Sequence, residues 1–304
     1  MSKLRFGLAL GGGGARGFAH IGVLNRLEEM GLQPDIITGA SMGSMVGAVY
    51  TRTRNAEATF EILDGMVQSD EFRSLGLHLI NVKRRGGASF WHQVSSAIQD
   101  RIVINLAQMK KGLVSSEKLE AAVKVAINED IWSNDGMELG IVATDLHSGE
   151  DVYFTEGSMV EAVMASIAIP GFLPPVEIGG RTLVDGGVSQ QVPIRMAKEM
   201  GADFVLAVDV GQDVEPVTEL DNAMSIMSQS EAIKSCHYRD MLNREADVLL
   251  DLKMPGVHWS AYDRREEFVK MGEDAFSNFQ VTLKDAMYLK KHPRLGRLRN
   301  FMSL

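Results

Sequence analysis

Residues 4–24, LRFGLALGGGGARGFAHIGVL, place an apolar run, a glycine-rich turn and a helical pattern in immediate succession. Within this stretch, Gly12-x-Gly14-x-x-Gly17 has the spelling of a dinucleotide-binding fingerprint, which also joins a strand to a helix. Backbone N–H groups at such a helix start can bind an anion, and the spelling alone does not identify the anion. The stretch predicts a parallel strand–turn–helix unit with an anion-binding first turn.

Strand-like and helix-like segments alternate along the rest of the 304 residues. The predicted strands are residues 4–10, 36–38, 139–146, 151–155, 181–185, 203–210 and 247–252. The predicted helices are residues 17–30, 42–50, 56–69, 117–128, 160–168, a short one after Pro193, 221–244 and 263–290. Such alternation predicts an α/β fold, with a largely parallel sheet covered by helices on both faces.

Composition narrows the possible partners and compartments. The formal net charge is −9, which argues against a general nucleic-acid binder. Cys236 is the single cysteine, so an internal disulfide and a thiolate metal cluster are both excluded. There is no uninterrupted apolar run of about 18 residues, and the apolar run before the glycines is too short for a signal peptide. We expect a soluble cytoplasmic protein, and peripheral membrane contact stays open.

Three polar or glycine-rich turns follow apolar strands. They are Gly11–Gly14, Gly39–Gly43 and Asp185–Gly187. In open α/β sheets, ligands bind at the carboxyl ends of the strands. If the three strands are neighbours, the turns converge on one site.

The second turn, Gly39-Ala40-Ser41-Met42-Gly43, matches a nucleophile elbow. Glycines two residues before and after a serine relieve crowding at a sharp strand-to-helix turn and leave the hydroxyl exposed. The alternative is an ordinary tight turn in which Ser41 caps the following helix. The strand–turn–helix context favours the nucleophile.

A serine nucleophile needs a base. The chain has seven histidines, at positions 20, 78, 92, 147, 237, 258 and 292, and none lies in a recognisable catalytic context. Only one strand precedes the elbow strand, which fits the α/β-hydrolase fold poorly. Asp185 remains as the base, because burial beside the serine would raise its pKa and its proton affinity. Gly186 and Gly187 permit the turn that aims its carboxylate inward, although Asp-Gly turns are common.

The glycine loop has two interpretations. A dinucleotide site requires an acidic residue at the end of the second strand, but Asp35 precedes that strand and the elbow occupies its end. The same backbone amides can hold an oxyanion formed during acyl transfer. Gly13 and Gly14 are the candidate donors. Arg16 either adds positive charge or serves as a structural ion-pair partner.

Together, GGGGARG, GASMG and DGG resemble the patatin-like phospholipases, particularly the bacterial members of about 300 residues. Ala165-Ser166-x-Ala168-x-Pro170 resembles a further block of that family, and we expect Ser166 to have a packing role. The resemblance implies a three-layer α/β/α sandwich and a histidine-free Ser41–Asp185 dyad. It also implies an oxyanion loop of Gly12, Gly13, Gly14 and Arg16. Elbow and turn support is expected from Gly17, Gly39, Gly43, Gly186 and Gly187.

One departure from the family lies after the aspartate turn. Family members often carry asparagines there, whereas this chain has Gln190 and Gln191. The substitution puts the hydrogen bonding of that loop in doubt, not the dyad.

The implied domain organisation is a single domain over residues 1–304. Residues 5–200 would form the catalytic core, with a lid insertion at 72–115. Residues 201–290 would form a strand and helix extension, and 291–304 a basic tail. Aromatic and basic residues of the insertion, and the tail, are candidates for contact with a membrane surface.

The implied function is hydrolysis of phospholipid or other fatty-acyl esters through an acyl-serine, with no metal and no cofactor. The alternatives are a nucleotide-binding oxidoreductase that uses the glycine loop, and a non-catalytic lipid-binding protein. The physiological substrate and the oligomeric state cannot be read from the sequence.

Overall fold

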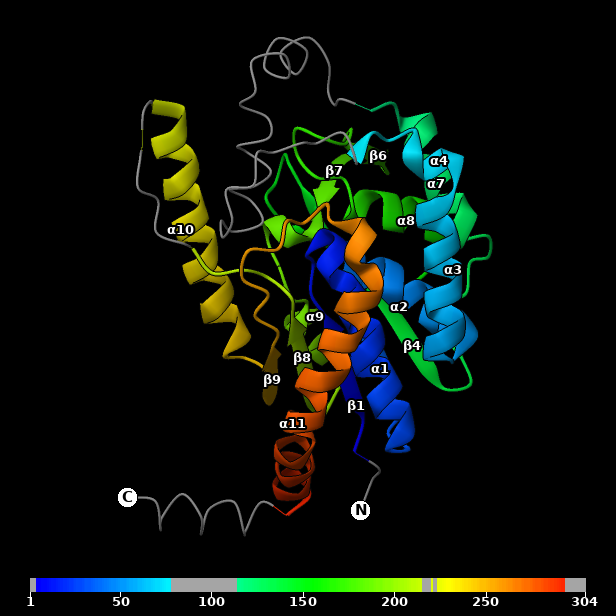
Figure 1. The fold of residues 1–304 in the computed structure, drawn as a ribbon, viewed down its shortest axis with the longest axis vertical. Coiled ribbons are helices and arrows are strands. Elements are labelled where there is room, and N and C mark those ends of the chain that lie inside the picture. Colours follow the sequence, from blue (N-terminus) through cyan, green and yellow to red (C-terminus); the bar gives the residue numbers. More distant parts are fainter. Residues whose placement is uncertain (1–3, 78–113, 215–219, 221–222, 293–304) are drawn as a thin grey trace.

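The computed structural model describes residues 4–77, 114–214, 220 and 223–292. Most of the predicted lid insertion and most of the basic tail lie outside these residues. The described part forms helices packed around one central sheet (Figure 1). The predicted α/β/α fold is confirmed.

The described strands form one nine-stranded sheet in the order β6-β7-β4-β2-β1-β8-β9, with β3 and β5 also paired to β4. Their bounds are β1 Phe6–Leu10, β2 Ile36–Gly39, β3 Ser133–Asn134, β4 Met137–Asp145, β5 Asp151–Phe154, β6 Val176–Ile178, β7 Arg181–Asp185, β8 Phe204–Asp209 and β9 Val248–Asp251. Strands β4, β2, β1, β8 and β9 run parallel to one another. Strands β3, β5 and β7 are antiparallel to β4, and β6 is antiparallel to β7, so the sheet is mixed at that side.

The helices fall close to the predicted segments. They are η1 Gly14–Phe18, α1 Ala19–Glu29, α2 Met42–Thr53, α3 Ala56–Gln68, α4 Asp70–Arg73, α7 Ser116–Ala126, α8 Met159–Ser166, η3 Gly186–Val188, α9 Ile194–Glu199, α10 Ala223–Asn243, η4 Tyr262–Arg264 and α11 Arg265–Lys291. The predicted first helix divides into η1 and α1. It ends before Gly31, whose φ of 65° is the left-handed conformation that favours glycine after a helix.

The two faces of the sheet are buried against different helices. Leu8 and Leu10 of β1 belong to the larger apolar cluster, which includes residues of α1, α2, α3 and α11. Ala9, between them, belongs to a smaller cluster with Ile194 and Ala197 of α9. Because successive side chains of a strand point to opposite faces, β1 must be apolar at every position, as its sequence is.

The described helices were also compared with the requirements of a bilayer. None of them combines the length and the hydropathy that a membrane-spanning segment needs.

Candidate active site

Ser41 lies on the sharp turn between β2 and α2. Its backbone has φ 51° and ψ −124°, a conformation that is strained for any residue other than glycine. The turn is too tight for side chains on either side of Ser41. A Cβ on Gly39 would lie 2.5 Å from the carbonyl carbon of Gly43, and a Cβ on Gly43 would lie 2.2 Å from the Leu10 oxygen. The glycine spacing of the elbow therefore has a steric cause.

Asp185 is the last residue of β7 and is fully buried. Its Oδ1 accepts a hydrogen bond from the Gly187 backbone N–H at 2.7 Å. Gly186 lies so close to β4 that a Cβ there would be 2.3 Å from the Val142 oxygen. The turn after β7 thus holds the carboxyl group in the protein interior.

Burial raises the pKa of Asp185 from 3.8 to about 7, although interactions with the Ser41 hydroxyl and the Gly187 N–H each lower it. Among the described residues, no Lys or Arg forms an ion pair with this carboxyl group. Oδ2 accepts no hydrogen bond of ordinary geometry from a described residue, yet the Ser41 hydroxyl is close enough to affect the pKa. Ser41 and Asp185 therefore lie near one another, and no described histidine hydrogen-bonds either of them.

The sheet register explains how the two residues meet. The prediction assumed neighbouring strands, but β4 separates β7 from β2. Gly39 pairs with Ile141 of β4, and Asp185 pairs with Ala143. Because β7 is antiparallel and overlaps only the last residues of β4, its carboxyl end stops just above the carboxyl end of β2. The turns after β2 and β7 therefore converge, although the two strands run in opposite directions.

Ser166 lies closer to the elbow than a packing role would require. It is the last residue of α8, and its Oγ accepts a hydrogen bond from the Ser41 backbone N–H at 3.0 Å. Ser44 also contributes, because its Oγ donates to the Ser41 carbonyl at 2.6 Å. Both polar groups of the strained Ser41 backbone are thereby satisfied. Ser166 is fully buried, as a packing role requires, and its hydroxyl additionally hydrogen-bonds the elbow.

The glycine loop lies beside the elbow, and its amides differ in availability. The N–H groups of Gly11 and Gly12 donate to the carbonyls of Val208 and Gln191 at 3.0 and 2.9 Å. The N–H groups of Gly13 and Gly14 have no acceptor among the described residues. Within the predicted loop, Gly13 and Gly14 are thus the residues whose amides remain available to an anion.

Gln191, one of the two glutamines that follow the aspartate turn, hydrogen-bonds the glycine loop. Its carbonyl accepts from the Gly12 N–H, and its side-chain amide donates to the Gly12 carbonyl. Gln190 instead binds Asp151 and Tyr153 with its side-chain amide. The glutamines therefore hydrogen-bond the glycine loop and β5.

Arg16 is fully buried behind the glycine loop. Its Nε donates to the Gly13 carbonyl at 3.2 Å, and its two terminal nitrogens find no partner among the described residues. Burial lowers its pKa to about 10, while the charge of Asp209 raises it. The alternative in which Arg16 is a structural ion-pair partner finds no described carboxylate at ion-pair distance, and the hydrogen bond from Nε links Arg16 to the loop at Gly13.

The described histidines do not approach Ser41 as hydrogen-bond partners. His20 contacts the Gly11 carbonyl at 2.7 Å, and burial lowers its pKa to about 4. His258 contacts Ser260 at 2.8 Å. His78 and His92 lie outside the described residues. In the described part of the chain, no group of His, Cys, Asp and Glu side chains has the arrangement of a metal site.

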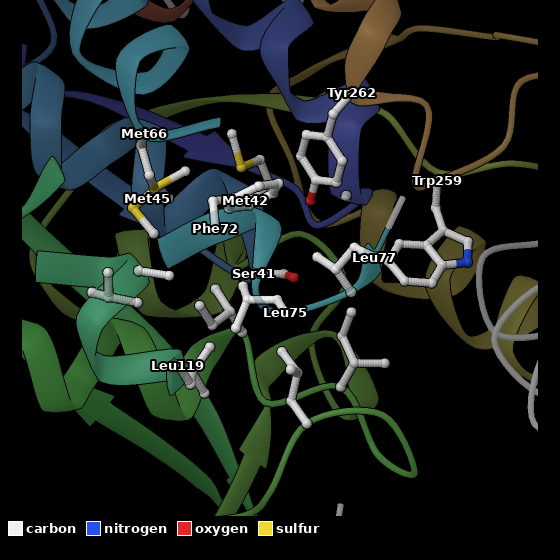
Figure 2. A pocket seen from close by; sticks show the side chains of 16 residues that line it. Ser41, Met42, Met45, Met66, Phe72, Leu75, Leu77, Leu119, Trp259 and Tyr262 are labelled. Atoms are coloured by element: carbon white, nitrogen blue, oxygen red, sulfur yellow. The ribbon is translucent and has the colours of Figure 1, made fainter. Parts of the chain in front are cut away.

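An apolar pocket opens above Ser41 (Figure 2). The space between its lining atoms is about 550 Å³, and this volume includes the open solvent at its mouth. Its lining side chains come from α2, α3, α4, α7, the segment after α8 and the region near η4. They include Met42, Met45, Met66, Phe72, Leu75, Leu77, Leu119, Leu173, Trp259 and Tyr262. The pocket could hold an acyl chain with its carbonyl next to Ser41.

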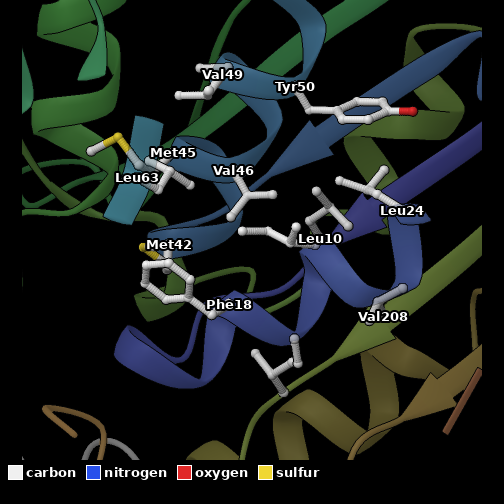
Figure 3. Close-up of a cluster of buried hydrophobic side chains, with 14 of the residues drawn as sticks. Leu10, Phe18, Leu24, Met42, Met45, Val46, Val49, Tyr50, Leu63 and Val208 are labelled. Atoms are coloured by element: carbon white, nitrogen blue, oxygen red, sulfur yellow. The ribbon is translucent and has the colours of Figure 1, made fainter. Parts of the chain in front are cut away.

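Around α2, the pocket wall is continuous with the hydrophobic core (Figure 3). Met42 and Met45 belong to both, while Val46 and Val49 pack within the core cluster. The elbow helix is thus anchored on its apolar side, which keeps Ser41 at the base of the pocket.

The sequence model of the family described as patatin-like phospholipase matches residues 8–198. An uncharacterized NTE family protein of Mycobacterium tuberculosis is 32% identical over 224 residues, covering 72% of this chain and 53% of that protein. The human patatin-like phospholipase domain-containing protein 6 is 31% identical over 210 residues, covering 68% of this chain and 13% of that protein.

A fungal relative and a solved structure complete the comparison. Lysophospholipase NTE1 of Coccidioides immitis is 31% identical over 209 residues, covering 67% of this chain and 11% of that protein. The crystal structure of VipD from Legionella pneumophila covers 96% of this chain and 67% of its own, with 16% identity and a TM-score of 0.47. The chain spans about half the length of the mycobacterial relative and a smaller share of the other two relatives.

Proposed function

The chain belongs to the patatin-like phospholipase family, and from that premise we propose that it is a serine hydrolase of fatty-acyl esters. The observation that carries the proposal is the placement of Ser41, on a strained turn beside a buried carboxylate and at the base of an apolar pocket. In this proposal Ser41 is the nucleophile and Asp185 is the base.

Asp185 suits the role of base because burial raises its pKa to about 7, near the pH at which a cellular enzyme works. It takes the proton of Ser41 as Oγ attacks the acyl carbonyl. Gly13 and Gly14 then direct their available N–H groups at the oxyanion. The C–O bond breaks, the leaving alkoxide takes the proton, and water hydrolyses the acyl-serine in the same way. This reaction requires no metal or cofactor.

The lining of the pocket supports an acyl chain as the group that is bound. Its named side chains are nearly all apolar, and none is a charged group that would hold a phosphate. The printed names of two relatives, a phospholipase-domain protein and a lysophospholipase, are consistent with a phospholipid or lysophospholipid substrate. We therefore propose that the head group stays at the pocket mouth and that the protein contacts membranes peripherally.

Labelling with a fluorophosphonate tests the nucleophile. We expect labelling of the wild type, none of Ser41→Ala, and strongly reduced labelling of Asp185→Asn. Ser277→Ala, in which an exposed serine of α11 is replaced, is the matched control and keeps full labelling. Undiminished labelling of Ser41→Ala would contradict the assignment.

A parallel assay with lysophosphatidylcholine distinguishes the other two interpretations. A non-catalytic lipid-binding protein predicts lipid binding that survives Ser41→Ala and no release of fatty acid by the wild type. A nucleotide-binding oxidoreductase predicts nicotinamide binding without serine labelling. The proposed hydrolase releases fatty acid, and Ser41→Ala abolishes the release.

A further inference from the structure

The segment from His258 to Tyr262 lies against the glycine loop. The family match ends at residue 198, so this segment belongs to the C-terminal extension and lies far from the loop in the sequence. The Trp259 carbonyl accepts a hydrogen bond from the Ala15 N–H at 2.7 Å. A Cβ on Gly14, whose φ is 59°, would lie 2.4 Å from the same oxygen. The loop that offers the two available amides is thus held from one side by this segment.

The segment is placed by close packing of α11 on α1. A Cβ on Gly22 of α1 would lie 2.0 Å from the Val269 oxygen, and one on Gly272 of α11 would lie 2.0 Å from the Ala19 oxygen. The two helices therefore touch backbone to backbone. Because η1 and α1 directly follow the glycine loop, this contact fixes η4 relative to Ser41.

Aromatic neighbours hold the Tyr262 ring. It meets Phe18 edge to face at a centroid distance of 6.5 Å, and Phe72 at 5.0 Å. Beside it, Trp259 meets Phe172 at 5.5 Å. Both Tyr262 and Trp259 line the pocket that contains Ser41.

The Tyr262 hydroxyl points into the pocket on the side of Ser41 (Figure 2). It has no hydrogen-bond partner among the described residues. Burial, and then the charge of Asp185, raise its pKa, so the hydroxyl keeps its proton at neutral pH and is a neutral donor. No described side chain occupies this donor, so an oxygen of a ligand in the pocket can accept its hydrogen bond.

We propose that Tyr262 is a catalytic residue whose hydroxyl donates a hydrogen bond to the leaving-group oxygen of the ester. The proposal rests on the function proposed above. Gly13 and Gly14 already offer two N–H donors to the oxyanion. The Tyr262 hydroxyl, which points into the same pocket on the side of Ser41, is therefore assigned to the other oxygen that gains charge, the leaving oxygen.

The step balances without a further reactant. The Ser41 proton passes to Asp185 as the bond from Oγ to the acyl carbon forms. The electron pair of the breaking C–O bond goes to the leaving oxygen, which then takes the proton from Asp185. Tyr262 stabilises the charge on that oxygen during the step and keeps its own proton.

Two esters of one fatty acid test the proposal in Tyr262→Phe. A p-nitrophenoxide leaving group spreads its negative charge over the ring and the nitro group, whereas an alkoxide concentrates its charge on oxygen, so the alkyl ester should depend far more on Tyr262. We expect kcat/KM to fall about 10- to 100-fold for the alkyl ester and by less than about threefold for the p-nitrophenyl ester. Tyr288→Phe, which changes an exposed tyrosine of α11, should leave both values unchanged.

The outcomes separate the two proposals. Equal losses for both esters would overturn the leaving-group role, because a displaced loop or pocket wall affects both esters alike. No loss for either ester would overturn it as well. A wild type that hydrolyses neither ester would contradict the proposed hydrolase itself. An unchanged melting temperature of Tyr262→Phe ensures that the loss is not one of folding.

Discussion

Two buried aspartates end two strands of the same sheet, and their surroundings differ. Asp185 ends β7 and Asp209 ends β8. Each accepts, through Oδ1, a hydrogen bond at 2.7 Å from the backbone N–H two residues later. Asp209 also accepts from Asn243 at 2.7 Å and pairs with Arg239 at 3.2 Å. Asp185 has only the Ser41 hydroxyl as a further neighbour with an effect on its pKa.

The local turn alone does not raise the proton affinity of a carboxyl group. Both turns present a carboxylate in the same way, but only at Asp209 does a buried guanidinium compensate the negative charge. At Asp185 burial is uncompensated by any described cation, so the carboxyl group has a raised proton affinity. The raised proton affinity of Asp185 thus results from the absence of a counter-ion among the described residues.

The largest effect is expected from Asp185→Asn. The substitution keeps the shape of the side chain and removes the proton acceptor, so kcat/KM for a fatty-acyl ester should fall about 10⁴-fold. The measurement is ester hydrolysis, accompanied by thermal unfolding to show that the variant is folded. Full activity of this variant would show that another group is the base. Asp185 and Asp209 would then not differ in function.

Asp209→Asn should instead affect stability. It leaves the Arg239 guanidinium, which is 5% exposed, without its buried carboxylate. The free energy of unfolding should fall by about 3–5 kcal/mol in urea titrations. The double variant Asp209→Asn with Arg239→Met should recover part of the loss. If Asp209→Asn is as stable as Asp185→Asn, the two aspartates do not differ in the way described.

The pH dependence of activity tests the raised pKa of Asp185 directly. With the pKa of Asp185 raised to about 7, kcat/KM should increase about tenfold per pH unit below that value and then level off. A profile that levels off near pH 4 would show that Asp185 titrates like an exposed carboxyl group.

Stability should change in the opposite direction over the same window. Between the ordinary pKa of 3.8 and about 7, folded Asp185 holds a proton that the unfolded chain has released. Its contribution to stability is therefore present at low pH and is lost as the pH rises through about 7. Melting temperatures of the wild type should fall relative to those of Asp185→Asn over this range, and parallel curves would contradict the expectation.

The smallest effect on activity is expected from a change at Ser166, whose Oγ accepts the hydrogen bond from the Ser41 N–H. Ser166→Ala removes the acceptor of the Ser41 N–H and should cost about 1–3 kcal/mol of stability, with a loss of activity of about tenfold. Ser158→Ala, at the other end of α8, removes the hydrogen bond to the Glu161 N–H and is the matched control. It should cost about 1 kcal/mol and leave the activity per folded molecule unchanged.

The local parts of the site follow from short stretches of sequence. The elbow needs Gly39 and Gly43 because backbone atoms fill the space of their side chains: those of Gly43 itself at Gly39, and those of Leu10 at Gly43. The strands and helices were also predictable, since β1 and β8 are apolar at nearly every position, as doubly covered strands must be. Such features depend on neighbours along the chain, which a single sequence displays.

The distant contributors were not predictable in the same way. Ser166 reads as one small residue among others in an apolar helix, and only the approach of α8 to the elbow gives its hydroxyl a partner. Trp259 and Tyr262 lie in an irregular segment without a motif, and they reach the pocket because α11 packs on α1. In the sequence they are an aromatic pair before a long helix, and their place in the pocket follows only once the packing of that helix is known.

The sequence by itself therefore determined the fold class, the elbow at Ser41, the Asp-Gly-Gly turn and the glycine loop, because each shows as a short pattern of apolar residues and glycines along the chain. Only the tertiary structure decided that β7 runs antiparallel and stops level with Ser41, and which loop amides remain available. It also decided that Asp185 has no described counter-ion while Asp209 has one. Register, burial and charge compensation are properties of residues far apart in the chain, and they are set only when the whole sheet is assembled.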